Sequence, residues 1–209
     1  MEHRKPKPRA IIEGHPALLV IDIQRGSFQK DDGAIRHMAG YGERMAKARE
    51  VIAQARQADI PVVFIQEVHR PDLVDFGREL DGDEAIHCLE GEPNTEIAAE
   101  EIGFQPGDYH VPKRRYSAFF GTDLEILLKG LKVDTLLLVG GLTDVCVHYT
   151  FVDGHQNDYH CRVIEEVVAG SCEAAHEASL RAMEYLQTGA RRSLAEITEA
   201  MAAYGGAGA

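Results

Sequence analysis

Short runs of apolar residues alternate along the chain with longer amphipathic stretches. The run "PALLVIDIQ" (16–24) is apolar over most of its length, which is typical of a strand buried on both faces. The stretch "ERMAKAREVIAQARQAD" (43–59) instead repeats its apolar residues at helical spacing, which predicts an amphipathic helix. The predicted strands cover 16–24, 61–67, 108–113, 134–141 and 159–166, with a short strand near Ala190. The predicted helices cover 43–59, about 122–131, about 143–157, 172–187 and 193–201.

Near-continuous apolar strands separated by helices imply a parallel sheet covered on both faces. We therefore predict a Rossmann-like α/β fold, a three-layer α/β/α sandwich around a six-stranded parallel sheet. Neither an internal repeat nor an interdomain linker divides the chain. We expect a flexible N-terminal tail over 1–13 and a single domain over 14–204.

Composition and charge narrow the class of protein. With 209 residues the chain is long enough to bury a core without disulfides, and its four cysteines lack the spacing of a metal knuckle. The formal net charge of −12 argues against a nucleic-acid or membrane-surface binder. The sequence has no 18-residue apolar run and no signal-peptide pattern, so we expect a cytoplasmic protein.

Residues whose side chains could take part in catalysis lie at the carboxyl ends of the predicted strands. In open α/β sheets the ligand binds beyond the carboxyl ends of the strands, and Asp22, Glu67, Lys113 and Cys146 all fall there. Taken alone, each has a structural explanation, such as a helix cap for Asp22 or small-residue packing for Cys146. Together, a carboxylate, an ammonium and a thiol are sufficient for nucleophilic attack on a carbonyl. The start of a helix behind Cys146 would favour ionisation of its thiol.

Three segments resemble the isochorismatase-like cysteine hydrolases, a family that includes nicotinamidases, N-carbamoylsarcosine amidase, ureide and biuret hydrolases and streptothricin hydrolase. The resemblance covers roughly 14–190 and rests on "LLVIDIQRGSF", "KRRYSAFFGTDL" and "GGLTDVCVHYTFVDGHQNDY". It implies that Asp22 is the general base, Lys113 its cationic partner and Cys146 the nucleophile.

The resemblance also implies details of the substrate site. It places a non-proline cis peptide at Gly141–Leu142, with the amides of Leu142 and Cys146 forming an oxyanion hole. Aromatic side chains at three further positions would wall the substrate pocket. These positions are Phe28, Tyr116 and Phe119.

The implied activity is hydrolysis of a C–N bond in a small amide, lactam or ureide through a cysteinyl thioester, as in a nicotinamidase. Isochorismatase itself cleaves a vinyl ether and lacks the cysteine, so Cys146 favours C–N chemistry. A streptothricin-type lactam hydrolase and a biuret or ureide hydrolase are the alternatives, and a catalytically silent binding protein is the alternative of another class. The resemblance implies no organic cofactor, and it implies a homodimer or homotetramer.

The long segment between the second and third strands suggests a metal site. "HCLEGEPN" (87–94) resembles a nicotinamidase stretch, and aligning on it puts four residues on the metal-binding positions of nicotinamidases. These residues are Glu67, His69, Asp75 and His87. Their donors would suit a divalent Mn, Fe or Zn ion, the two carboxylates favouring Mn or Fe. A structural pair of histidines and a metal-free polar network remain alternatives.

This segment is also strongly acidic. Between Asp72 and Glu101 it has eleven acidic residues and one arginine. A solvated lid explains this composition, and a funnel that concentrates a cationic substrate is the alternative.

Overall fold

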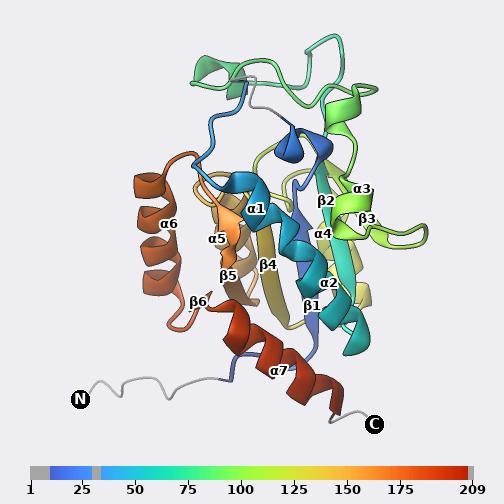
Figure 1. Ribbon diagram of the computed structural model, residues 1–209, viewed down its shortest axis with the longest axis vertical. Helices are drawn as coiled ribbons and strands as arrows, with labels where there is room; N and C mark the ends of the chain where they lie inside the picture. Colours follow the sequence, from blue (N-terminus) through green and yellow to red (C-terminus); the bar gives the residue numbers. More distant parts are fainter. Residues whose placement is uncertain (1–9, 30–33, 207–209) are drawn as a thin grey trace.

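The computed structural model describes residues 10–29 and 34–206, and its strands form one all-parallel sheet (Figure 1). The strands are β1 (Pro16–Ile21), β2 (Val62–Glu67), β3 (Tyr109–Lys113), β4 (Thr135–Gly141), β5 (His160–Ala169) and β6 (Arg191–Arg192). Their spatial order is β3-β2-β1-β4-β5-β6, so the six-stranded parallel sheet predicted from the sequence is confirmed. The chain moves outward from β1 to β3 and then returns to the other side of β1 with β4. Ligand sites of such sheets lie at this reversal, beyond the carboxyl ends of β1 and β4.

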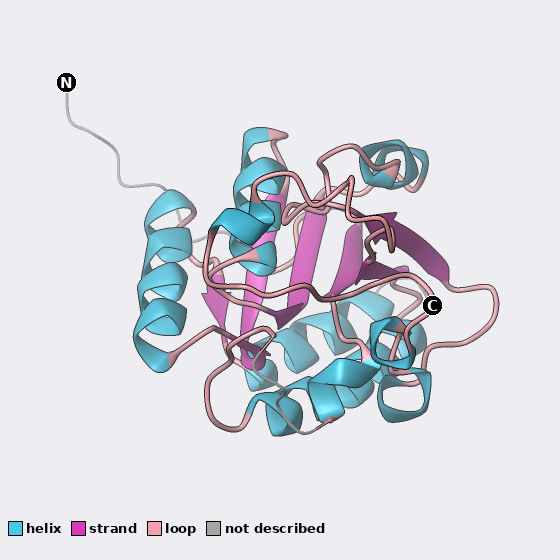
Figure 2. Cartoon of the chain, turned by 90° about the horizontal axis from the view of Figure 1, so that it is seen from above, coloured by secondary structure: helices cyan, strands magenta, loops and turns pink. Residues whose placement is uncertain are grey.

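Helices cover both faces of the sheet, as Figures 1 and 2 show. The α-helices are α1 (Tyr41–Ala46), α2 (Ala48–Gln57), α3 (Ala99–Ile102), α4 (Leu124–Gly130), α5 (Cys146–Gln156), α6 (Glu173–Leu186) and α7 (Leu194–Gly206). Three short 3₁₀ helices are η1 (Arg25–Phe28), η2 (Glu79–Asp81) and η3 (Pro93–Thr95). The buried residues of α1, α2, α3 and α7 pack on one face of the sheet, and those of α4, α5 and α6 pack on the other.

The apolar strands form two cores because neighbouring residues of a strand point to opposite faces. In β1, Leu18 and Val20 belong to the core under α1, α2 and α7, whereas Leu19 and Ile21 belong to the core under α4, α5 and α6. All four side chains are buried. A strand with both faces buried needs apolar residues at every position, which explains the uninterrupted run in the sequence.

Some element boundaries differ from the sequence prediction. The strand predicted over 16–24 ends at Ile21, because Asp22 adopts a left-handed backbone conformation with φ of 53°. The helix predicted over 43–59 is two helices that meet at Lys47. The fifth strand continues beyond the predicted 159–166 to Ala169.

The predicted N-terminal tail over 1–13 falls largely on residues 1–9, which lie outside the described residues. Its last residues make defined contacts, since the N–H of Glu13 donates to Thr135 Oγ1 at 2.9 Å. Within the described ranges, the helices are all too short or too polar to cross a membrane.

Two glycines at the end of β4 allow the backbone to approach its neighbours closely. Gly140 has a φ of 118°, and a Cβ on it would lie 1.9 Å from the carbonyl oxygen of Ile21. A Cβ on Gly141 would lie 2.1 Å from the hydroxyl of Tyr41. Only glycine fits at either position. The pair therefore brings the end of β4 against the end of β1, next to Asp22.

Candidate active site

A cavity of about 300 Å³ lies beyond the carboxyl ends of the central strands. Asp22, Glu67 and Cys146 all line it. Asp22 follows β1, Glu67 ends β2, and Cys146 is the first residue of α5. The position expected from the strand pattern is thus the position of the cavity.

Local backbone geometry fixes these side chains. The N–H of Asp22 donates to the carbonyl oxygen of Ile65 at 3.1 Å, which ties the end of β1 to β2. The Gly141–Leu142 peptide is cis, as the family resemblance implies. The N–H groups of Val145 and Val147 both donate to the carbonyl oxygen of Leu142 at 3.1 Å, so the chain turns sharply into α5. This turn presents Cys146 at the helix start.

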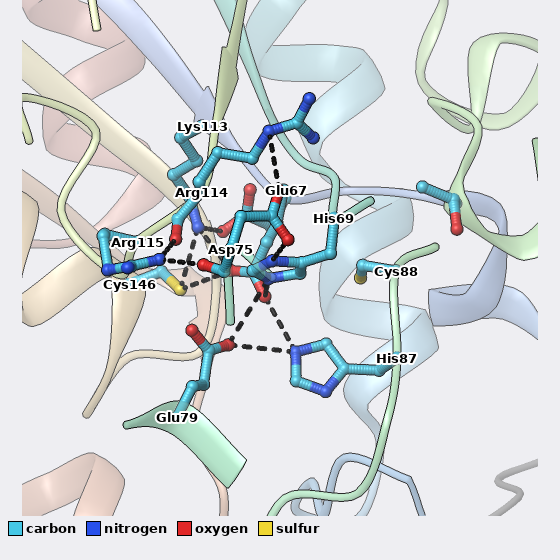
Figure 3. Close-up of polar contacts among 12 residues, drawn as sticks. Glu67, His69, Asp75, Glu79, His87, Cys88, Lys113, Arg114, Arg115 and Cys146 are labelled. Carbon is cyan, nitrogen blue, oxygen red and sulfur yellow. Dashed lines mark hydrogen bonds and ion pairs between the residues drawn. The ribbon is translucent and has the colours of Figure 1, made fainter. Parts of the chain in front are cut away.

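The predicted triad of Asp22, Lys113 and Cys146 comes together around the Lys113 ammonium group. Lys113 Nζ lies 2.9 Å from Asp22 Oδ2 and donates a hydrogen bond to Cys146 Sγ at 3.3 Å. Glu67 joins the group, because its Oε2 accepts from Lys113 and from Cys146 Sγ, the latter at 3.4 Å (Figure 3). The Lys113 side chain is fully buried, so its charge acts on these partners with little screening by solvent.

Burial sets the protonation states of the base and the nucleophile. Burial raises the pKa of Asp22 to about 6, although the Lys113 charge opposes the rise. Burial also raises the pKa of the Cys146 thiol well above its usual value, against the effect of Lys113. The helix start predicts easier ionisation of this thiol, but burial acts in the opposite direction and favours the protonated form at rest. The thiol must lose its proton during the reaction.

The other two charged groups stay ionised. Burial disfavours the Lys113 ammonium, but Asp22, Cys146 and Glu67 outweigh it and hold the pKa of Lys113 well above its usual value. Burial likewise disfavours the Glu67 carboxylate, but Lys113 and the two histidines beside it hold the pKa of Glu67 well below its usual range. The site thus contains a permanent ion pair beside the thiol.

A second group of side chains adjoins the triad. This His–Glu cluster consists of Glu67, His69, Glu79 and His87. All four residues are buried, and one potential ligand atom from each lies within 4.8 Å of the others. His87 Nε2 lies 2.8 Å from Glu67 Oε1 and 3.1 Å from Glu79 Oε1. His69 Nε2 lies 3.5 Å from Glu67 Oε1 and 3.7 Å from Glu79 Oε1.

The two carboxylates and two imidazole rings of the His–Glu cluster need a proton or a metal ion between them. His87 Nδ1 lies 2.6 Å from the carbonyl oxygen of Ala85, so Nδ1 carries the proton and Nε2 faces two carboxylates. Neither ring nitrogen of the fully buried His69 hydrogen-bonds to any described residue. A bare imidazole lone pair against carboxylate oxygens is repulsive, and a proton or a metal ion between them removes the repulsion.

Without a metal ion, the histidines themselves supply the positive charge. Burial lowers the pKa of both rings, but the adjacent carboxylates of Glu67 and Glu79 outweigh burial. They raise the pKa of His69 to about 9 and that of His87 to about 10. Two imidazole nitrogens and two carboxylate oxygens are also a donor set that divalent Zn, Mn or Fe accepts. The residues present therefore fit a metal ion.

The structure corrects one member of the predicted metal set. Asp75 lies outside the His–Glu cluster, with its Oδ1 3.5 Å from Nδ1 of His69, and Glu79 is the fourth residue of the cluster. Asp75 accepts hydrogen bonds from the N–H of Arg70 at 3.1 Å and pairs with Arg114 at 3.3 Å. These contacts hold the Asp75 carboxylate beside Nδ1 of His69, the ring nitrogen that faces away from Glu67 and Glu79.

The predicted aromatic walls are also corrected. Tyr116 lines the cavity, but Phe28 and Phe119 do not. Phe28 packs against the core under α1 and α2, and the Phe119 ring lies 6.0 Å from the Tyr159 ring in the opposite core. Sequence reasoning missed several polar side chains that do line the cavity. They include Gln24, Tyr41, Glu84 and Asn94.

Comparison with known proteins identifies the family and the fold. Residues 16–196 match the family model described as "Isochorismatase domain". The ureidoacrylate amidohydrolase RutB of Methylorubrum extorquens strain DM4 is 30% identical over 213 residues, covering 91% of this chain and 80% of the relative. A cysteine hydrolase structure from Pseudomonas syringae pv. phaseolicola 1448A matches with a TM-score of 0.82 at 25% identity, covering 96% of this chain and 99% of that one.

A further structure, an isochorismatase-like hydrolase from Alkaliphilus metalliredigens, matches with a TM-score of 0.78 at 27% identity. That match covers 90% of this chain and 99% of the other. The family match spans every strand of the described sheet, from the first residue of β1 into α7. The chain belongs to the isochorismatase family.

Proposed function

We propose that this enzyme, a hydrolase of C–N bonds other than peptide bonds, cleaves a small amide, lactam or ureide through a thioester on Cys146. The observation that carries the proposal is that a carboxylate and a thiol on one cavity wall both contact a buried ammonium group behind that wall. Lys113 contacts both of the others there, Asp22 at 2.9 Å and Cys146 at 3.3 Å. Ureides are the first class to test, because RutB, by its name, acts on ureidoacrylate.

In the first step, the Cys146 sulfur bonds to the carbonyl carbon while Asp22 accepts the thiol proton. This transfer is needed because burial keeps the thiol protonated at rest. The ammonium of Lys113 stabilises the developing negative charge on sulfur, to which it already donates. The amides of Leu142 and Cys146 receive the carbonyl oxygen as it gains charge.

In the second step, the C–N bond breaks and the proton held by Asp22 moves to the leaving nitrogen. The same carboxylate then deprotonates a water molecule, which attacks the thioester carbon. The C–S bond breaks, the thiol regains a proton, and the product is a carboxylic acid. A ureide would give a carbamic acid, which releases carbon dioxide and an amine.

We also propose that Glu67, His69, Glu79 and His87 hold a divalent Mn, Fe or Zn ion. The orphaned nitrogens of His69 and the two carboxylates that face His87 support this. When bound, the ion supplies positive charge beside Glu67 and fixes the loop that carries Glu79 and His87. No organic cofactor is part of the proposal.

The homodimer or homotetramer and the cytoplasmic location expected from the sequence stay predictions. The first rests on the family resemblance and the second on composition. Sedimentation of the purified protein would determine its oligomeric state.

Ammonia release from a substrate panel tests the proposed function. The panel comprises nicotinamide, pyrazinamide, biuret, N-carbamoyl amino acids and maleamate. Ring opening of streptothricin is measured separately, by mass spectrometry. We expect turnover of at least one ureide or amide, together with a covalent adduct on Cys146 in acid-quenched protein. Turnover of one panel member without a Cys146 adduct would disprove the thioester route. Silence across the whole panel would favour the silent binding protein.

The acid limb of the pH–rate profile is expected to report Asp22. Its carboxylate must be deprotonated to act as a base, and its pKa is raised to about 6. The fraction of active enzyme therefore falls about tenfold for each pH unit below that value. We expect kcat/KM to decline below pH 6 while circular dichroism shows an intact fold. A flat profile down to pH 4.5 would contradict the assignment of Asp22 as the base.

A further inference from the structure

Glu84 is a half-buried carboxylate on the cavity wall without a partner of its own. It lines the same cavity as Cys146. It makes neither a hydrogen bond nor an ion pair with any residue in the described parts of the chain. A carboxylate that loses water without gaining a partner is destabilised, so this position favours a ligand that brings a positive charge.

The position of Glu84 is fixed by its neighbours. The N–H of Ala85 donates to the carbonyl oxygen of Ala34 at 2.9 Å. The carbonyl oxygen of Ala85 lies 2.6 Å from Nδ1 of His87, which belongs to the His–Glu cluster. Glu84 therefore precedes a residue that is held at both its N–H and its carbonyl oxygen, which keeps the Glu84 carboxylate on the cavity wall.

The charges around the cavity compensate Glu84 only in part, because burial raises the pKa of its carboxyl although His87 and Lys113 oppose the rise. Four carboxyl residues line the cavity, whereas no lysine or arginine does so within the described ranges. These carboxyl residues are Asp22, Glu67, Glu84 and Glu92. Lys113 offsets Asp22, and a divalent ion in the His–Glu cluster would offset Glu67 and Glu79. Glu84 and Glu92 then still carry excess negative charge at the cavity.

We propose that Glu84 selects substrates whose non-reacting end carries an ammonium or guanidinium group. This inference rests on the proposed function, because it assigns the substrate class of the same cavity. It separates this enzyme from ureidoacrylate hydrolysis, since ureidoacrylate is itself a carboxylate and would be repelled. The acidic segment between Asp72 and Glu101 then acts as the outer part of a funnel for cations.

Three ureas of matched size test the inference. They are 2-aminoethylurea, propylurea and 3-ureidopropanoate, which differ mainly in the charge at one end. We expect kcat/KM, measured by ammonia release, to be about tenfold or more higher for 2-aminoethylurea than for propylurea, and lowest for 3-ureidopropanoate. Raising the ionic strength should reduce these differences.

Glu84→Gln should abolish the preference for the cation by raising KM for 2-aminoethylurea while leaving propylurea nearly unchanged. Asp83→Asn is the matched control. Asp83 is the adjacent residue, its side chain is 90% exposed and it does not line the cavity. This variant should keep the wild-type ranking.

Binding of the three ureas to the Cys146→Ala variant, measured by calorimetry, separates charge selection from catalysis. We expect 2-aminoethylurea to bind about tenfold or more tightly than propylurea. If it binds no more tightly than propylurea, or if Glu84→Gln leaves the preference intact, the inference is overturned. If binding follows charge but no amide or ureide is hydrolysed, the selection by Glu84 stands and the proposed function fails.

Discussion

Replacing Cys146 with alanine is expected to lower kcat/KM by about 10³-fold or more, because it removes the atom that forms the thioester. Cys146→Ser should be nearly as inactive. An alcohol is a far weaker acid than a thiol, and a carboxylate with a pKa of about 6 is a poor base for it. Initial rates on the best panel substrate, together with intact-protein mass, provide the measurement.

Two controls distinguish loss of the nucleophile from loss of the fold. Cys172 is exposed, so Cys172→Ala should retain wild-type activity. The thermal unfolding midpoint of Cys146→Ala should stay close to that of the wild type, since serine-sized and alanine-sized side chains fit where a cysteine is buried. Retention of more than about a tenth of the activity by Cys146→Ala would disprove the assignment of the nucleophile.

The strand pattern was sufficient to predict the fold and the position of the triad. Because β1 is buried on both faces, its sequence is apolar without interruption, and the polar Asp22 marks the point where it ends. Lys113 is the last residue of β3, and Cys146 begins α5 after the turn that follows β4. Parallel strands bring their carboxyl ends to one edge, so the meeting of these residues follows from topology alone.

The loop side chains could not be assigned in the same way. Asp75 and Glu79 are two of eleven acidic residues between Asp72 and Glu101, and no periodicity distinguishes them. Only the turn of η2 directs Glu79 inward, to 2% exposure of its side chain, whereas the Asp75 side chain is 17% exposed. Alignment to a family motif selected Asp75 by its order in the sequence. The path of the loop instead brings Glu79 into the His–Glu cluster and leaves Asp75 outside it.

The direction of the pKa shift of Cys146 could also not be predicted from the sequence. A helix start lowers the pKa of a thiol, but the extent of burial is not visible in a string of residues. In the structure, burial outweighs the opposing charge of Lys113 and raises the pKa of the thiol. The consequence is mechanistic, because the base must act in the same step as the attack.

Glu67 connects the two halves of the site. Its Oε2 accepts from Lys113 and Cys146, and its Oε1 lies 2.8 Å from Nε2 of His87. A positive charge in the His–Glu cluster therefore acts on Lys113 and Cys146 through the Glu67 carboxylate, which contacts both groups. Loss of the cluster's cation should affect catalysis as well as the loop.

Glu79→Gln is expected to weaken binding of a divalent ion by about 10³-fold, whereas Asp75→Asn should weaken it by about 10- to 100-fold. The reason is that Glu79 offers an oxygen inside the His–Glu cluster, while Asp75 lies outside it, 3.5 Å from the other ring nitrogen of His69. Metal content after equilibration with Mn, Fe or Zn gives the affinity. The absorption spectrum of the cobalt(II) form reports the ligand set, which Glu79→Gln should change and Asp75→Asn should preserve.

Asp81→Asn is the control for both substitutions, since Asp81 belongs to the same 3₁₀ helix as Glu79 and pairs on the surface with Arg78 at 2.9 Å. It should bind metal like the wild type. The opposite ranking, with Asp75→Asn the more damaging change, would reinstate the ligand set predicted from the sequence. If the wild type binds none of the three ions stoichiometrically, the protonated histidines alone balance Glu67 and Glu79. Enzyme treated with a chelator would then keep full activity, whereas a metal site should lose at least about 100-fold because Glu67 also contacts Lys113 and Cys146.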